Sequence, residues 1–163
     1  MMYSAIDIAD YIIISANKKN IKISNLKLQK LLYYVQAASL VFENRPIFSD
    51  KIQAWKYGPV VEEVYHTFKV FANDAIEKPA SEFSLSFILN KRHDEEIEDR
   101  DKELIDRVVD SYKDYSAIKI MKKTHSEAPW KETFERTNKI ISHDIIQSYY
   151  SENQGEIYGQ EQK

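Results

Sequence analysis

The sequence predicts a mainly α (α+β) fold: a single compact helical domain around a central hydrophobic helix, with a small β-hairpin near residues 46–57. Apolar residues recur at three- and four-residue steps along several segments, which is the spacing of an amphipathic helix. The segment 24–42 is apolar around most of its circumference, as is typical of a helix that other helices surround. A chain of 163 residues also has the usual length of one domain.

Serine residues mark the start of the first two predicted helices. Ser4 is followed by an acidic residue in the first helical turn, where a carboxylate interacts favourably with the helix dipole. Ser24 precedes the central helix in the same way. Arg45-Pro46 then ends that helix, because proline lacks an N–H and restricts the residue before it.

A short β-like segment follows the central helix. Ile47-Phe48, a polar turn at residues 49–51 and the apolar residues of 52–57 predict a hairpin. Gly58-Pro59 ends the hairpin, and proline at the first helical position is expected to start a third helix.

The second half of the chain predicts three more helices. The first follows an acidic stretch, 94–103, that we expect to be a solvated loop leading into a helix start. Ser116 caps the second, which closes at residues 128–130, and Ser142 caps the last. Residues 1–150 are therefore expected to form the domain, and the polar residues 151–163 a flexible C-terminal tail.

The composition excludes several classes of function. The absence of cysteine excludes disulfide scaffolds, thiolate metal sites and cysteine nucleophiles, and three glycines cannot build a phosphate-binding loop. The four histidines lack the spacing of common zinc sites, and Glu62 and His66, four residues apart, are expected to form only a surface pair. We therefore predict no catalytic residues, no metal and no cofactor, and hence a protein that is not an enzyme.

The sequence also predicts a cytoplasmic protein that does not enter a membrane. The longest apolar stretch, residues 31–42, is shorter than the roughly 20 residues that a membrane span needs. Asp7 and Asp10 stand where a signal peptide would carry positive charge.

Two aromatic clusters are unusual for plain packing. Residues 54–60 (AWKYGPV) place two large aromatic side chains before a tight turn, and residues 124–130 (THSEAPW) end a helix at a proline beside a tryptophan. Trp, Tyr and His suit interfaces, because they bury much area while keeping a polar group. Two interpretations remain open at this point: the clusters contact a partner, or Trp55 and Trp130 only fill corners of the core.

The order of these motifs resembles the Panacea antitoxin domain, also called the SocA-like antitoxin domain. The resemblance runs from about residue 6 to residue 150 and is carried by LKLQKLLYYVQAASLVF, WKYGPVVEEVY, DYSAIKIMKKTHSEAPWKETF and ISHDIIQSYY. It implies a bacterial or phage antitoxin that neutralises a protein toxin by binding it, often a toxin encoded by an adjacent gene. The family pairs one domain with many unrelated toxins, so the resemblance leaves the target open. The residues expected to contact the partner are Trp55, Tyr57, Gly58, Pro59, Tyr65, His125, Pro129 and Trp130.

Two other functions remain open at the level of sequence. A phage or mobile-element adaptor that binds a host protein would need the same surface. A nucleic-acid-binding regulator, the less favoured hypothesis, would use a lysine cluster that otherwise forms a solvated rim, and its binding would weaken steeply with salt. This cluster consists of Lys18, Lys19, Lys22, Lys27 and Lys30. The acidic stretch 94–103 could in the same way steer a basic partner, or simply be solvated.

Overall fold

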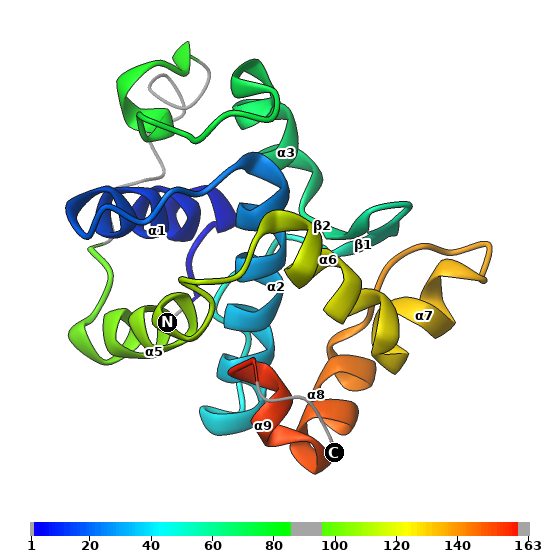
Figure 1. Ribbon diagram of the computed structural model, residues 1–163. Helices are drawn as coiled ribbons and strands as arrows, with labels where there is room; N and C mark the ends of the chain where they lie inside the picture. Colours follow the sequence, from blue (N-terminus) through cyan, green and yellow to red (C-terminus); the bar gives the residue numbers. More distant parts are fainter. Residues whose placement is uncertain (1, 86–95, 160–163) are drawn as a thin grey trace.

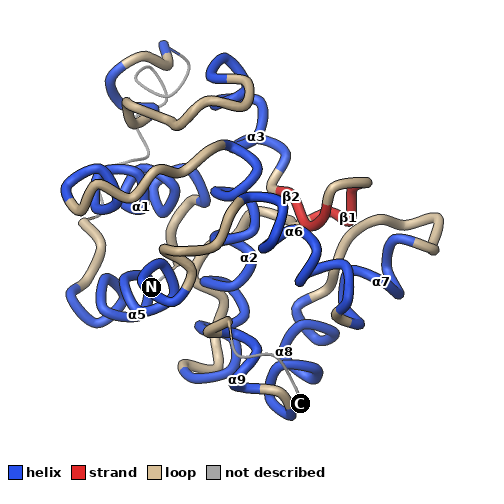
Figure 2. The backbone as a smooth tube through the Cα atoms, viewed as in Figure 1, coloured by secondary structure: helices blue, strands red, loops and turns tan. Residues whose placement is uncertain are grey.

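The computed structural model describes residues 2–85 and 96–159. The helices surround α2, with α1 and α5 along one side, α6 along another, and α8 and α9 near its C-terminal end (Figure 1). Strands are a minor part of the fold (Figure 2), and the predicted mainly helical domain with a small hairpin is confirmed. The elements are α1 (Ala5–Lys18), α2 (Asn25–Phe42), β1 (Gln53–Trp55), β2 (Gly58–Val60), α3 (Glu62–Phe68), η1 (Lys69–Phe71), η2 (Ala80–Glu82), α5 (Asp99–Ser111), α6 (Ala117–Ser126), α7 (Ala128–Phe134), α8 (His143–Glu152) and α9 (Gln154–Ile157).

All four predicted serine caps are present. Ser4, Ser24, Ser116 and Ser142 each precede a helix, and each hydroxyl accepts a hydrogen bond from the backbone N–H three residues further along. A cap of this kind stabilises a helix by about 1 kcal/mol, because it satisfies a donor that has no partner within the helix.

The central helix is buried on all sides. Fifteen of the 18 residues of α2 are buried, and they include six polar side chains that water cannot satisfy. We call these six the main-chain anchors, because each of them hydrogen-bonds to the backbone of a segment around α2. They are Asn25, Lys27, Gln29, Lys30, Gln36 and Ser39.

Each anchor holds a different part of the chain. Gln36 accepts hydrogen bonds from the backbone N–H groups of residues 47 and 48, at 2.8 and 3.3 Å, and donates one to the carbonyl of residue 48. Gln29 accepts from the N–H of residue 61 at 2.9 Å, and Asn25 donates to the carbonyl of residue 65. Lys27 donates to the carbonyl of residue 115 at 2.7 Å, and Ser39 to that of residue 45. The buried polar groups of α2 thereby fix the loops that surround it.

The hairpin is present, but its position along the chain differs from the prediction. The strands β1 and β2 pair Trp55 with Gly58 and Gln53 with Val60, so the turn lies at residues 56–57 and not at 49–51. Gly58 has a φ of +108°, a conformation that glycine adopts without strain, and it permits the tight reversal here. Pro59 is consequently in β2, and the third helix begins later, at Glu62, instead of at the proline.

Residues 151–159, within the segment predicted to be a flexible tail, pack against the helical domain. The helix α8 continues to Glu152, and α9 follows with Ile157 fully buried. Tyr112 donates to the carbonyls of residues 156 and 157, and the N–H of Gly159 donates to the Tyr112 hydroxyl, each at 3.0 Å. This segment therefore closes the core over Tyr112, a long-range contact that its polar composition does not indicate.

Part of the acidic stretch is also structural. Asp101 is completely buried at the start of α5, where it accepts hydrogen bonds from Arg45 at 2.7 Å and from the Tyr3 hydroxyl at 2.8 Å. The expectation of a solvated loop is therefore wrong for Asp101, which joins α5 to both the N-terminus and the end of α2. Asp94 and Glu95 lie outside the described residues.

Candidate protein-binding site

The fold brings the two aromatic clusters together. The Trp130 indole N–H donates to the carbonyl of Trp55 at 2.8 Å, which joins α7 to β1. The ring of His125 stacks on Trp130 with centroids 3.9 Å apart. Burial, and after it the nearby Lys30 ammonium, lower the pKa of His125 and so favour its neutral form. The motifs are 75 residues apart in sequence but form one structural unit.

Burial divides the expected contact residues into two groups. Gly58, Pro59 and Pro129 are buried, and Trp130 is 8% exposed, so these residues fill the interior beside the hairpin. The side chain of Tyr57, in contrast, is 58% exposed. Trp55, Tyr65 and His125 are half-buried, so each retains some exposed surface.

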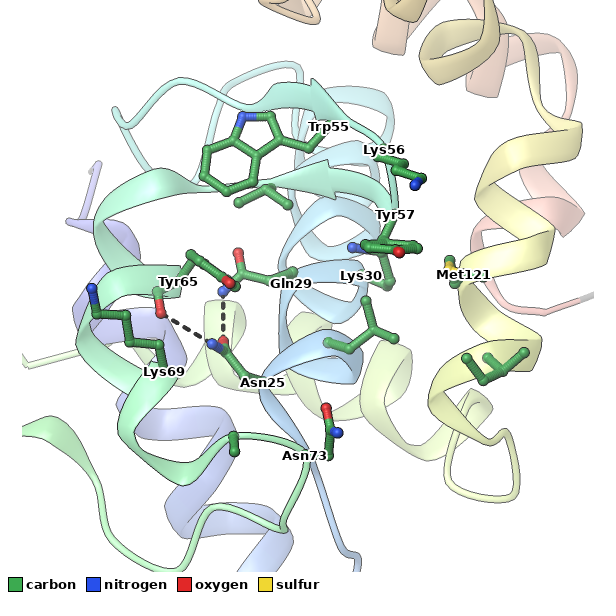
Figure 3. Close-up of a pocket in the computed structure, with 14 residues that line it drawn as sticks. Asn25, Gln29, Lys30, Trp55, Lys56, Tyr57, Tyr65, Lys69, Asn73 and Met121 are labelled. Carbon is green, nitrogen blue, oxygen red and sulfur yellow. Dashed lines mark hydrogen bonds between the residues drawn. The ribbon is translucent and has the colours of Figure 1, made fainter.

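A pocket of about 550 Å³ opens next to the exposed group (Figure 3). The hairpin forms one wall, α3 and η1 a second, α6 a third, and the first turns of α2 the floor (Figure 3). We call it the aromatic pocket and define it by its apolar lining: Leu26, Trp55, Tyr57, Val60, Tyr65, Ala72, Ile118 and Met121. Trp55 and Tyr65 meet edge to face, with ring centroids 5.3 Å apart.

The charged groups of the aromatic pocket have one sign. Among the described residues that line it, the ionisable charged side chains are all lysines: Lys30 in the floor, and Lys56 and Lys69 at the rim. The polar floor also contains Asn25 and Gln29, whose amides bond to each other at 3.0 Å. The pocket therefore combines aromatic walls with positive potential, which suits an apolar segment carrying negative charge.

Gly58 and Lys30 pack unusually closely at the edge of this pocket. The Lys30 ammonium donates to the carbonyl of Pro59 at 3.0 Å, and Lys30 is 0% exposed. A Cβ atom at position 58 would lie 2.5 Å from Lys30 Cε and 3.0 Å from Thr124 Oγ1. Only glycine fits here, so the Tyr-Gly-Pro turn serves to seat the hairpin on α2 and α6.

A second buried polar cluster lies on the opposite side of α6. Lys123 and Glu127 form an ion pair of 2.6 Å, and their side chains are 3% and 4% exposed. The Glu127 carboxylate accepts from the Tyr34 and Tyr150 hydroxyls, while Lys123 also donates to the carbonyl of Glu156 in α9. Burial raises the pKa of Glu127, and the Lys123 ammonium opposes that shift.

The residue pattern alone does not predict this cluster. The spacing of Lys123 and Glu127, four residues apart across the end of α6, was an available signal for an ion pair. Their burial was not visible, because it depends on tyrosines from α2 and α8. The arrangement joins α2, α6, α8 and α9, which is a structural role.

Other candidate chemistry is limited. Glu62 and His66 lie 3.7 Å apart and are both about half exposed, as expected of a surface pair. Within residues 2–85 and 96–159, the structure gathers no group of three side chains that could hold a metal ion. None of the described helices combines the length and apolarity that crossing a membrane requires.

The lysine cluster is not the continuous surface that the sequence indicated. Lys27 and Lys30 are 4% and 0% exposed, so the expectation of a solvated rim is wrong for both. Lys18, Lys19 and Lys22 remain exposed, and Lys19 pairs with Asp110 at 3.3 Å. These two buried lysines are consequently unable to contact phosphates, so a nucleic-acid interface could use only the other three.

The fold is a small helical domain with an aromatic pocket on its surface. The family model described as "Antitoxin SocA-like, Panacea domain" matches residues 28–131, and the chain belongs to this family. The chain is also similar to Antitoxin SocA of Caulobacter vibrioides (strain NA1000 / CB15N), with 35% identity over 129 residues, or 76% of this chain. The match spans just under two thirds of that relative, 66% of its length. No solved structure matches the chain.

Proposed function

We propose that this chain is a cytoplasmic antitoxin that neutralises a protein toxin by direct binding, without catalysis, and that the toxin docks on the aromatic pocket. Membership of the antitoxin family supports the antitoxin role. The toxin is proposed to be the product of an adjacent gene. The observation that carries the choice of surface is the exposed apolar wall of the pocket, contributed by both the hairpin and α6.

Two large side chains at the mouth of the pocket are exposed to solvent instead of packing against the domain. Tyr57 and Ile118 are 58% and 50% exposed, although both are large and apolar. Gathered beside half-buried Trp55, Tyr65 and Met121, they form a patch that a partner would remove from water. Aromatic residues at the centre of such patches carry most of the binding energy in protein interfaces.

The test is a growth-rescue assay with surface variants. The adjacent gene is induced in a bacterial host with and without this chain, and the survivors are counted. We expect the chain to restore growth, and Tyr57→Ser or Ile118→Ser to abolish rescue. Ile14→Ser is the matched control, because Ile14 is 41% exposed on α1 and lies outside the pocket.

Two results would contradict this proposal. If the product of the adjacent gene is harmless, or if it kills the host cells even when this chain is present, the toxin pairing is refuted and a host protein is favoured as the partner. If both pocket variants still rescue growth, and the toxin still co-purifies with both, the toxin binds another surface of the chain.

A further inference from the structure

Lys30 is a buried cation without a counter-charge. Its ammonium can donate three hydrogen bonds, but among the described residues it donates only to the carbonyl of Pro59. No carboxylate in the described part of the chain lies within ion-pair distance of it. Lys123, by comparison, is equally buried and has a carboxylate, a hydroxyl and a carbonyl as partners. An unpaired buried ammonium is costly, so its presence in this position needs a reason.

The surroundings of Lys30 offer it no compensation. Tyr57 lies beside it in the hairpin turn, His125 of α6 is close enough to interact with it electrostatically, and the other ionisable groups that line the pocket are Lys56, Tyr65 and Lys69; none of these is an acid. Burial lowers the pKa of Lys30 to about 7, because the charged form loses its water. A carboxylate beside the ammonium would restore the charged form and use its free donors.

We propose that the aromatic pocket binds a carboxylate attached to an apolar group, and that Lys30 is the residue that binds the carboxylate. In the partner protein, this ligand is an Asp or Glu side chain next to an aromatic or aliphatic residue. The apolar neighbour packs between Trp55, Tyr65 and Met121, and the carboxylate accepts hydrogen bonds from the ammonium below. The rim lysines Lys56 and Lys69 attract the same negative charge from solution. The identity of the partner rests on the proposed function, but the chemistry of the pocket does not.

Tyr57 controls access to the ammonium. It lies on the same side of the pocket as Lys30 (Figure 3) and is more than half exposed. Its side chain makes no hydrogen bond that the described residues would lose if it rotated about χ1. We therefore expect the ring to move aside and then cover the carboxylate, which keeps water from the new ion pair.

The pocket can be tested without the toxin by using small probes. We would titrate the isotope-labelled full chain with 3-phenylpropionate and with its neutral amide, 3-phenylpropanamide, and follow amide shifts by NMR at pH 6.5. The acid is expected to bind about tenfold more tightly than the amide, which corresponds to one charge-assisted hydrogen bond. The shifts should centre on residues 25–30, 55–60 and 118–121.

Variants assign the preference to Lys30. Lys30→Met should bind both probes equally, while Lys22→Gln, which changes an exposed lysine outside the pocket lining, should keep the preference for the acid. Direct measurement of the Lys30 side-chain resonances in the wild type covers the case in which Lys30→Met unfolds: the acid should raise the pKa of Lys30, and the amide should not.

The outcomes separate this inference from the proposed function. Equal binding of acid and amide, no binding of either, or an acid preference that survives in Lys30→Met would overturn the carboxylate site. Each of these results would leave the rescue assay to decide on toxin neutralisation. An acid preference together with failed rescue would support the pocket chemistry and assign it to a partner other than the neighbouring toxin.

Discussion

Replacement of Gly58 by alanine tests how the hairpin is seated on the helices. The backbone φ of +108° is disfavoured for any residue with a Cβ, which costs about 1–2 kcal/mol. The added Cβ would also lie 2.5 Å from Lys30 Cε and 3.2 Å from its Cδ, so the buried lysine must move. Forced repacking of a filled interior costs typically about 1–3 kcal/mol. The sum predicts that Gly58→Ala lowers the free energy of unfolding by about 2–5 kcal/mol.

The assay is urea denaturation followed by tryptophan fluorescence. A loss of this size would lower the melting temperature by roughly 5–15 °C in a domain of this length. Gly155→Ala is the matched control, because Gly155 is exposed in α9 and has no positive φ. We expect it to be neutral or stabilising by about 0.5–1 kcal/mol, since alanine is the better helix former.

A double-mutant cycle separates the two contributions to the loss at Gly58. In a Lys30→Ala background the collision with Lys30 is removed, so Gly58→Ala should cost less: the backbone strain of about 1–2 kcal/mol and the remaining tight contact with Thr124 Oγ1. Stability of Gly58→Ala within about 0.5 kcal/mol of the wild type would refute the reasoning. If Gly58→Ala lowers the free energy of unfolding equally in both backgrounds, only the close contact with Lys30 is refuted, and the backbone strain is not.

Three further predictions concern the buried polar groups and the C-terminal segment. Glu127→Ala should lower the free energy of unfolding by about 3–5 kcal/mol, because it leaves Lys123 buried without its carboxylate; a loss below 1 kcal/mol in urea denaturation would contradict the ion pair. A chain ending at Asn153 should be less stable by about 2–4 kcal/mol, since the buried Ile157 side chain and the carbonyl groups of α9 that accept hydrogen bonds are lost. An unchanged midpoint of urea denaturation would show that this segment has no structural role. Because the pKa of Lys30 is lower in the folded protein than the usual 10.5, the unfolded chain binds more protons between pH 7 and 10.5, so stability rises with pH. The wild type should therefore gain up to about 1.4 kcal/mol per pH unit relative to Lys30→Met between pH 7 and 9, and parallel pH profiles would contradict the shift.

The sequence correctly predicts those features of the fold that depend only on neighbouring residues. The serine caps and the all-round apolar character of α2 depend on residues within one or two turns, so the helices and the central position of α2 could be predicted. The two aromatic clusters were also identified, although not that Trp130 would bond to the backbone of Trp55. That contact depends on how α7 folds back towards the hairpin, which no local pattern specifies.

The errors arose where a residue acts through distant neighbours. The hairpin turn was placed too early, because Gly58 was interpreted as a terminator and not as the residue whose φ permits the reversal. Lys27 and Lys30 were assigned to the surface by their charge, yet a helix that is buried on all sides also buries its lysines. The same logic explains Ile157, whose burial depends on Tyr112 far away in sequence.

The main-chain anchors of α2 have a consequence for how such a protein can change. Gln29, Gln36 and Lys30 hold the surrounding loops by their backbone N–H and carbonyl groups, which every residue except proline supplies in full. The exposed residues of the hairpin turn, unlike the buried Gly58, are therefore not the ones that fix its position. Substitution at the exposed Lys56 or Tyr57, but not at Gly58, can alter the shape and charge of the pocket while the hairpin keeps its place. Lys30 serves both folding and the proposed recognition, but the exposed residues of the turn serve recognition alone, so selection can exchange one partner for another without first rebuilding the domain.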